Sequence, residues 1–191
     1  MTIVNFKSLI VGVGTGTGII TSTDGRNWYD SGNTTSFGDL NSVIGMGTHT
    51  VIVGASGTVG YSTDGRTFQP SKTFSRRIQL PITFFDDVTV SQDINDVTFG
   101  RTIGVAVGAA GTIMFTVNGP AGFGTGFTLT SRFTSQNLNG VAANNNIFVA
   151  VGDNGTILRS NDGQTWSGVT TTSITTKLND IAYDDGTWIA V

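Results

Sequence analysis

Aspartates are the side chains in this sequence that could do acid–base chemistry. All 13 acidic residues are Asp, and Glu is absent. A glycosidase needs two carboxyl groups flanking the scissile bond, one of which must hold a proton. Asp24, Asp64 and Asp162 each lie in a Ser-x-Asp-Gly-x-x-aromatic stretch, where a carboxylate can accept hydrogen bonds from the backbone N–H groups of its own turn. We interpret these three as turn staples, and we predict a protein that has no catalytic residues and is not an enzyme.

The sequence offers few ligands for a metal or a cofactor. His49 is the single histidine and there is no cysteine, which leaves no ligand set for zinc. Asp86 and Asp87 lack the spaced Asp and Asn residues of a calcium loop. Residues 12–18 are as glycine-rich as a phosphate-binding loop, but they lack its lysine and the helix expected to follow it. We therefore expect no metal and no cofactor.

The staples belong to a unit that the sequence repeats four times. Val-Gly steps bring Gly14, Gly54, Gly108 and Gly152 into one register, and their residue numbers give spacings of 40, 54 and 44. In each staple the glycine can adopt a positive φ, and the aromatic anchors the turn against apolar surface. The predicted staple residues are Ser22, Asp24, Gly25 and Trp28 in the first copy, Ser62, Asp64, Gly65 and Phe68 in the second, and Ser160, Asp162, Gly163 and Trp166 in the fourth.

Each unit contains four short segments with the composition of β-strands. In the fourth copy they lie around 141–142, at 147–151, at 156–159 and around 166–169, separated by Gly, Asn and Asp. The second segment is almost entirely apolar, as in a strand covered on both faces. We predict an all-β fold, a β-propeller of four-stranded antiparallel blades with about four and a half blades in this chain. The blades of this single domain are expected at about 1–38, 39–92, 93–136 and 137–177, with a half blade at 178–191.

The staples and the Val-Gly-x-x-Gly-Thr-Ile core resemble those of the Asp-box, or BNR-like, propellers. The motif of that family, Ser-x-Asp-x-Gly-x-Thr-Trp, is one residue longer than the stretches ending at Trp28 and Trp166. The shorter form resembles the low-charge propeller repeats of phage structural proteins and secreted bacterial proteins. The resemblance implies a propeller whose Asp boxes lie far from any active site. The family also includes sialidases, but their Tyr/Glu nucleophile pair cannot occur in a chain without Glu.

The two ends of the chain carry the same half of the unit. Residues 1–13 and 179–191 align with each other as the first two strands of a blade. A closed propeller usually splits one blade between its termini, so that the two parts complement each other. Because these ends duplicate each other, we expect the propeller to be incomplete and to continue past Val191 into further blades.

The second unit carries about 14 extra residues between Phe68 and Ile94. They are too apolar for a free loop, so they form either an extra hairpin that caps the blade or an interface with another chain, and we favour the interface. In the third unit, residues 119–127 replace the staple, which suggests a longer turn with Phe123 and Phe127 tucked against the blade. The candidate partner-binding residues of the insertion are Phe74, Arg76, Arg77, Ile78, Leu80, Phe84 and Phe85.

Charge and hydropathy restrict the partners. A net charge of −3 and a pI of about 4.8 argue against a nucleic-acid surface, which needs clustered Lys and Arg. No segment approaches the roughly 18 consecutive apolar residues of a membrane helix. The N-terminus lacks the basic start and apolar run of a secretion signal. We therefore expect neither nucleic-acid binding nor membrane insertion.

These observations lead to one favoured function and two alternatives. The favoured hypothesis is a non-enzymatic structural or adhesion protein of a phage virion, in a tail fibre, baseplate or capsid appendage. It would be made in the host cytoplasm, and its partners would be other virion proteins or copies of itself, with a host-surface glycan as a further partner. One alternative is a carbohydrate-binding module of an extracellular, secreted or surface protein. The other is an assembly-factor scaffold similar to the propellers of photosystem II assembly.

Overall fold

The computed structural model describes most of the 191 residues. The described ranges are 1–6, 8–16, 18–71, 74–79, 83–87, 90–117, 126–130, 132–145, 147–170 and 174–191, and in 74–79 and 83–87 they comprise the backbone alone. Leu80 and Phe123, which the sequence singled out, lie outside these residues.

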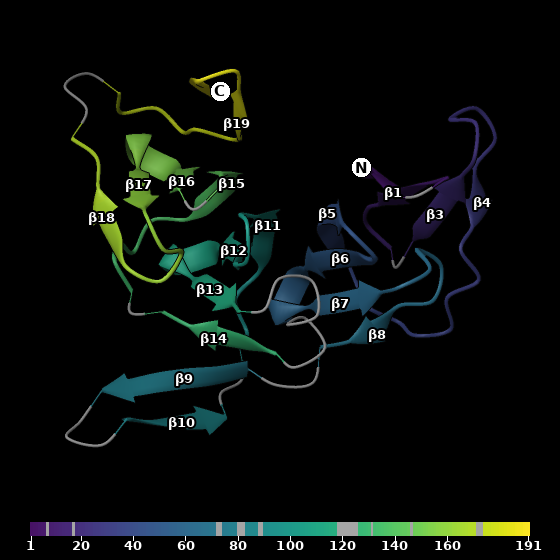
Figure 1. Cartoon of the computed structure of the whole chain (residues 1–191), viewed down its shortest axis with the longest axis horizontal. Helices are drawn as coiled ribbons and strands as arrows, with labels where there is room; N and C mark the ends of the chain where they lie inside the picture. Colours follow the sequence, from purple (N-terminus) through teal and green to yellow (C-terminus); the bar gives the residue numbers. More distant parts are fainter. Residues whose placement is uncertain are drawn as a thin grey trace.

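The described strands form five sheets in chain order, which we call blades 1 to 5. Figure 1 shows them following one another around an arc, from the N-terminal blade 1 to the C-terminal blade 5. Blade 1 contains β1 (Thr2–Phe6), β2 (Leu9–Val13), β3 (Ile19–Ser22) and β4 (Tyr29–Asp30). Blade 2 contains β5 (Leu40–Met46), β6 (His49–Gly54), β7 (Val59–Ser62) and β8 (Gln69–Pro70). Blade 4 contains β15 (Leu138–Asn144), β16 (Ile147–Gly152), β17 (Ile157–Ser160) and β18 (Trp166–Gly168), and blade 5 contains β19 (Ile181–Asp184) and β20 (Thr187–Ala190).

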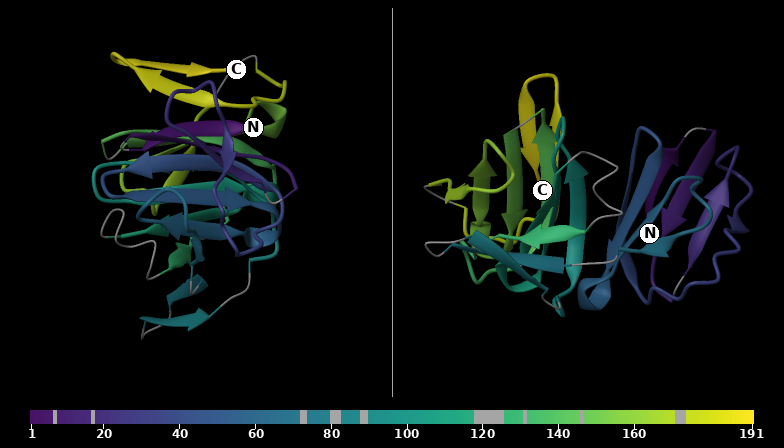
Figure 2. Two further views of the ribbon diagram at one scale, coloured as in Figure 1. Left: turned by 90° about the vertical axis from the view of Figure 1, so that its right-hand side faces the viewer. Right: turned by 60° about the horizontal axis from the view of Figure 1, so that its bottom comes forward.

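Blade 3 is wider than the others. Its own strands are β11 (Ile94–Phe99), β12 (Gly104–Gly108), β13 (Ile113–Thr116) and β14 (Phe127–Leu129). The insertion adds a hairpin of β9 (Phe74–Gln79) and β10 (Thr83–Asp87), giving the sheet order β10-β9-β14-β13-β12-β11. β9 runs parallel to β14, with Phe74 opposite Phe127. Figures 1 and 2 show this hairpin projecting beyond the outer strands of the arc.

The insertion therefore forms a hairpin, one of the two predicted arrangements, but it does not cap the blade that precedes it in the sequence. The predicted second blade, 39–92, contains the hairpin, whereas strand pairing places it in the sheet of blade 3. The reason is that β14, the last strand of blade 3, leaves an outer edge whose backbone groups can pair with β9.

Apolar side chains pack between successive blades. The second strands β6, β12 and β16 are buried along nearly their whole length, as the apolar run at 147–151 predicted. Each core cluster combines side chains of two neighbouring blades, for example Val51 and Val53 of blade 2 with Val97 and Met114 of blade 3. The arc is therefore held together by its seams, as expected for units that cannot bury their apolar faces alone.

A short 3₁₀ turn follows the second strand in three blades: η1 (Ala55–Gly57), η2 (Ala109–Gly111) and η4 (Asp153–Gly155). Its middle residue has a positive φ of about 53°, and its closing glycine has a φ between 66° and 73°. The connection that leads to the next blade crosses directly over this glycine. A Cβ on Gly155 would collide with the carbonyl oxygen of Ile174. This close approach explains the glycine of the Gly-Thr pair in the repeat.

Candidate functional site

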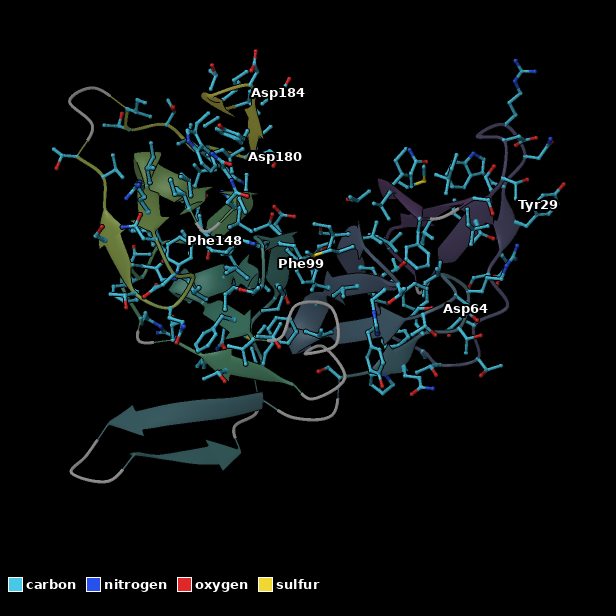
Figure 3. The ribbon with its side chains drawn as sticks, viewed as in Figure 1. Tyr29, Asp64, Phe99, Phe148, Asp180 and Asp184 are labelled. Carbon is cyan, nitrogen blue, oxygen red and sulfur yellow. The ribbon has the colours of Figure 1, made fainter. Side chains whose placement is uncertain are left out.

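The three predicted staples form the same hydrogen-bonded turn between the third and fourth strands of blades 1, 2 and 4. In blade 4 the Ser160 hydroxyl accepts hydrogen bonds from the N–H of Gly163 at 2.8 Å and of Asp162 at 3.2 Å, and it donates to Asp162 Oδ1 at 3.0 Å. The same Oδ1 accepts from the N–H of Gln164 and Thr165, at 2.9 and 2.7 Å. Ser22 with Asp24 and Ser62 with Asp64 repeat these contacts. Asp64 is labelled in Figure 3.

The staple aromatics pack as structural anchors. Trp166 is buried, its indole N–H donates to the Gly163 carbonyl at 3.2 Å, and its ring centroid lies 6.5 Å from that of Phe148. Phe68 is buried at the same position of blade 2. Trp28 makes the same hydrogen bond, to Gly25, at 3.3 Å, but it is only half-buried.

The turns also control the charge of their carboxylates. Hydrogen bonds from the N–H groups of Asn27 and Arg26 hold the pKa of Asp24 well below its usual range. Burial acts to raise the pKa of Asp64, but hydrogen bonds from Thr67 and Arg66 outweigh it and lower the pKa to about 2. Such carboxylates stay ionised at neutral pH, so they cannot act there as general acids.

We predict that Ser160→Ala lowers the free energy of unfolding by about 1–2 kcal/mol. The hydroxyl is buried, and its loss leaves the N–H groups of Gly163 and Asp162 without their acceptor. Urea denaturation measures the change. Ser167→Ala is the matched control, because Ser167 is exposed and should change the stability by less than about 0.5 kcal/mol. Equal effects of the two substitutions would contradict the staple assignment.

The first strands of the blades are tied to one another by asparagine side chains. Asn41, Asn95 and Asn139 follow a Leu or Ile at the start of β5, β11 and β15, next to a β-bulge. Each side-chain amide donates to a backbone carbonyl of the following blade: that of Ile94 at 2.9 Å, of Leu138 at 2.8 Å and of Leu178 at 2.8 Å, respectively. We call this set the Asn ladder.

Asp96 lies beside the Asn ladder and joins three blades. Its Oδ1 accepts from the Ser42 hydroxyl of blade 2 at 2.8 Å, and its Oδ2 accepts from the Val141 N–H of blade 4 at 2.8 Å. Burial raises the pKa of Asp96 to about 6, and the negative charge of Asp180 adds to this rise (Asp180 is labelled in Figure 3). A raised pKa is typical of a catalytic acid. Both oxygens are, however, already engaged by donors of the fold, which favours a structural tie.

The sequence missed Asp96 as a distinctive residue. Asp96 and Asp180 each follow a Leu-Asn or Ile-Asn pair, a pattern that by itself indicates only a turn residue. The bulge between Ile94 and Asp96 shifts the strand register, and the alternation of the sequence cannot reveal this shift. The recurrence of polar or small residues at this position, Ser42, Asp96, Gly140 and Asp180, was the available signal.

The insertion provides a further candidate for binding, the outer backbone edge of its hairpin. Phe74, Arg76, Arg77 and Ile78 lie on β9, and Phe84 and Phe85 lie on β10. Within the described part of the chain, β10 pairs with β9 alone, which leaves its other edge as the outer edge of the six-stranded sheet. Phe127, predicted to tuck against blade 3, is 1% exposed.

Among the described ranges, no three side chains of the His, Cys, Asp or Glu type gather closely enough to hold a metal ion. No described helix has the length and apolar character to cross a membrane.

Solved structures establish the fold. The computationally designed Ika8 protein matches with a TM-score of 0.67 at 13% identity, over 98% of this chain and 54% of that one. The fold is a β-propeller. A chain of the mitotic checkpoint complex matches at 0.61 and 11%, over 92% and 52%, and the extracellular domain of BT4673 from B. thetaiotaomicron matches at 0.66 and 15%, over 96% and 24%. This propeller spans about half of the first two chains and about a quarter of the third.

These likenesses confirm the predicted all-β fold of about four and a half blades. At this level of identity they concern the fold alone. No protein-family model matches this propeller, and no curated protein does.

Proposed function

We propose that this propeller is a non-enzymatic docking module of a phage virion, built into a tail fibre, baseplate or capsid appendage. The observation that carries the proposal is the hairpin β9–β10 on blade 3. It extends a complete four-stranded blade by two strands and presents β10 as the outer edge. An unpaired strand edge can add a strand from another protein, and the apolar sequence of the insertion supplies side chains for such a contact.

The scaffold supports a docking role because side-chain hydrogen bonds join its blades at many points. The Asn ladder joins blades 2 to 5, and Asp96 ties blades 2, 3 and 4. Insertions held on such a scaffold are the usual places for binding. The Ser-x-Asp-Gly staples further support a relationship to the Asp-box, BNR-like propellers with low charge. We infer other virion proteins or copies of this chain as partners.

The test is the presence of this chain in purified virions and its dependence on the hairpin. We expect mass spectrometry to find a fixed number of copies per particle. Phe84→Ser/Phe85→Ser should lower incorporation at least roughly tenfold, because these residues lie on the edge strand β10. Thr63→Ser is a conservative control on an exposed turn of blade 2 and should be incorporated normally.

Absence of the chain from virions would overturn the proposal. Binding to a glycan array by the same protein would then favour the carbohydrate-binding alternative. Normal incorporation of the double variant would overturn the role of the hairpin.

A further inference from the structure

The outer edges of the blades differ in length. In blades 1, 2 and 4 the outer strand is short: β4 and β8 have two residues each and β18 has three. The outer strand of blade 3 is β10, which has five residues and pairs with β9 without a register shift. Short edge strands, prolines and lysines commonly protect a sheet from foreign strands, and β10 has none of these protections. The projecting hairpin in Figures 1 and 2 therefore presents a long, regular edge.

The pairing within the hairpin shows which residues suit a strand beside β10. Its register places the aliphatic Ile78 opposite Phe84 and the basic Arg76 opposite Asp86. Opposite charges directly across an antiparallel pair stabilise it, whereas like charges destabilise it. Arg76 and Arg77 are the only two basic residues that are adjacent in the sequence. The inner neighbour of β10 is thus an aliphatic strand with two positive charges.

A second β10 strand is a poor occupant of the outer edge. β10 contains Asp86 and Asp87 and no basic residue, so two such strands bring four carboxylates together. In a parallel pair each Asp would lie opposite its own copy. In the antiparallel pair that overlaps all five residues, Asp86 would lie opposite Phe84 and Asp87 opposite Thr83, so neither Asp would gain a basic partner. The two aspartates therefore disfavour pairing between copies while leaving the edge open to a strand of opposite charge.

We propose that the outer edge of β10 binds an extended, positively charged segment of another protein, which adds to the six-stranded sheet as an antiparallel strand. The segment resembles β9: it has Arg or Lys opposite the two aspartates and an apolar residue opposite Phe84. Backbone hydrogen bonds supply the affinity of such strand addition, and the residues across the pair supply its selectivity. This inference rests on the docking role proposed for the hairpin, and it narrows the partner to a protein other than this chain.

The probe is a fluorescent peptide with the sequence of β9, Phe-Ser-Arg-Arg-Ile-Gln. It is titrated with the whole 191-residue chain and followed by fluorescence anisotropy. The peptide should bind at least about tenfold more tightly than a version with glutamate at both arginine positions, because the exchange turns two attractive charges into two repulsive ones. Only the peptide changes in this comparison, so the folding of the chain does not affect it.

A pair of substitutions in the chain locates the binding site. Asp86→Asn/Asp87→Asn should reduce the preference for the arginine peptide to less than about threefold. Asp184→Asn/Asp185→Asn is the matched control, because it removes the same charge from another adjacent Asp pair, on the exposed hairpin of blade 5. This control should keep the full preference. Thermal unfolding of both variants checks that they are folded.

N-methylation of the peptide tests whether binding uses the backbone. Along a strand, alternate N–H groups point to the same side, so one alternate set faces β10 and the other faces away. Methylating the set that faces β10 should weaken binding at least about tenfold, whereas methylating the other set should change it by less than about threefold. Attraction between charges alone would not distinguish the two peptides.

Three results would overturn the proposal. They are equal binding of the arginine and glutamate peptides, a preference that survives Asp86→Asn/Asp87→Asn, and equal binding of the two methylated peptides. A dimer of the chain alone that Phe84→Ser/Phe85→Ser abolishes would also overturn it, by showing that a second copy occupies the edge. None of these results bears on whether the chain occurs in virions, and absence from virions would leave the peptide binding unchanged, so the two proposals fail separately.

Discussion

Gly155→Ala is expected to lower the free energy of unfolding by about 3 kcal/mol or more, a severe loss for a single added methyl group. Gly155 has a φ of 66°, which costs an L-residue about 1 kcal/mol. A Cβ at this position would also collide with the carbonyl oxygen and carbon of Ile174, which belong to the connection toward blade 5. Backbone atoms cannot move aside like the end of a side chain, so the turn or the connection must be displaced.

Urea denaturation measures this loss, and Gly168→Ala is its matched control in the same blade. A Cβ on Gly168 meets open space, and no positive φ restricts the residue. The control should therefore change the stability by less than about 0.5 kcal/mol. A cost below about 1 kcal/mol for Gly155→Ala would show that the connection does not cross the turn as closely as described.

Asp96→Asn is expected to stabilise the protein by up to about 3 kcal/mol at pH 8 and by little at pH 4. The pKa of Asp96 is raised to about 6 by burial, whereas an Asp in the unfolded chain titrates near its usual 3.8. The contribution of Asp96 to stability is thus fully present below pH 3.8 and is lost as the pH rises through 6. Asn carries no charge, its Oδ1 can accept from Val141, and its amide can donate to the Ser42 hydroxyl.

Urea denaturation of both proteins at the two pH values measures the effect. Asp184→Asn, on the exposed hairpin of blade 5, should change the stability by less than about 0.5 kcal/mol at either pH. The staple carboxylates give stability the opposite dependence on pH from that of Asp96. Because the pKa of Asp64 is lowered to about 2, its contribution is present above 3.8 and is lost as the pH falls through 2. An Asp96→Asn variant that is less stable than the parent at pH 8 would contradict the raised pKa of Asp96.

The sequence predicted the blades because the structure of each repeat follows largely from interactions between residues that are close in the sequence. Ser160 and Asp162 form the expected turn because all its donors and acceptors lie within six residues. The buried second strands followed from continuous apolar runs in the same way. These features need no knowledge of distant contacts.

The unpredicted features depend on contacts between distant segments. The parallel pairing of β9 with β14 joins residues about 50 positions apart, and no turn sequence specifies it. The burial of Asp96 requires Ser42 and Val141 from two other blades. Trp28 and Trp166 have the same sequence motif, yet they differ in burial because blade 1 has no preceding blade within the described residues. Exposure at a repeat position thus depends on neighbours that the motif itself cannot specify.

The Asn ladder has a consequence for the way in which this arc comes apart. Each blade contacts its neighbours along the chain, so the arc behaves as a linear series of coupled units. Each ladder amide bonds to a carbonyl of the next blade, so the loss of one blade also leaves a donor of the preceding blade unpaired. Local opening of blade 5 therefore also weakens β15 through Asn139, so opening of one blade spreads to the blade before it as a cooperative event.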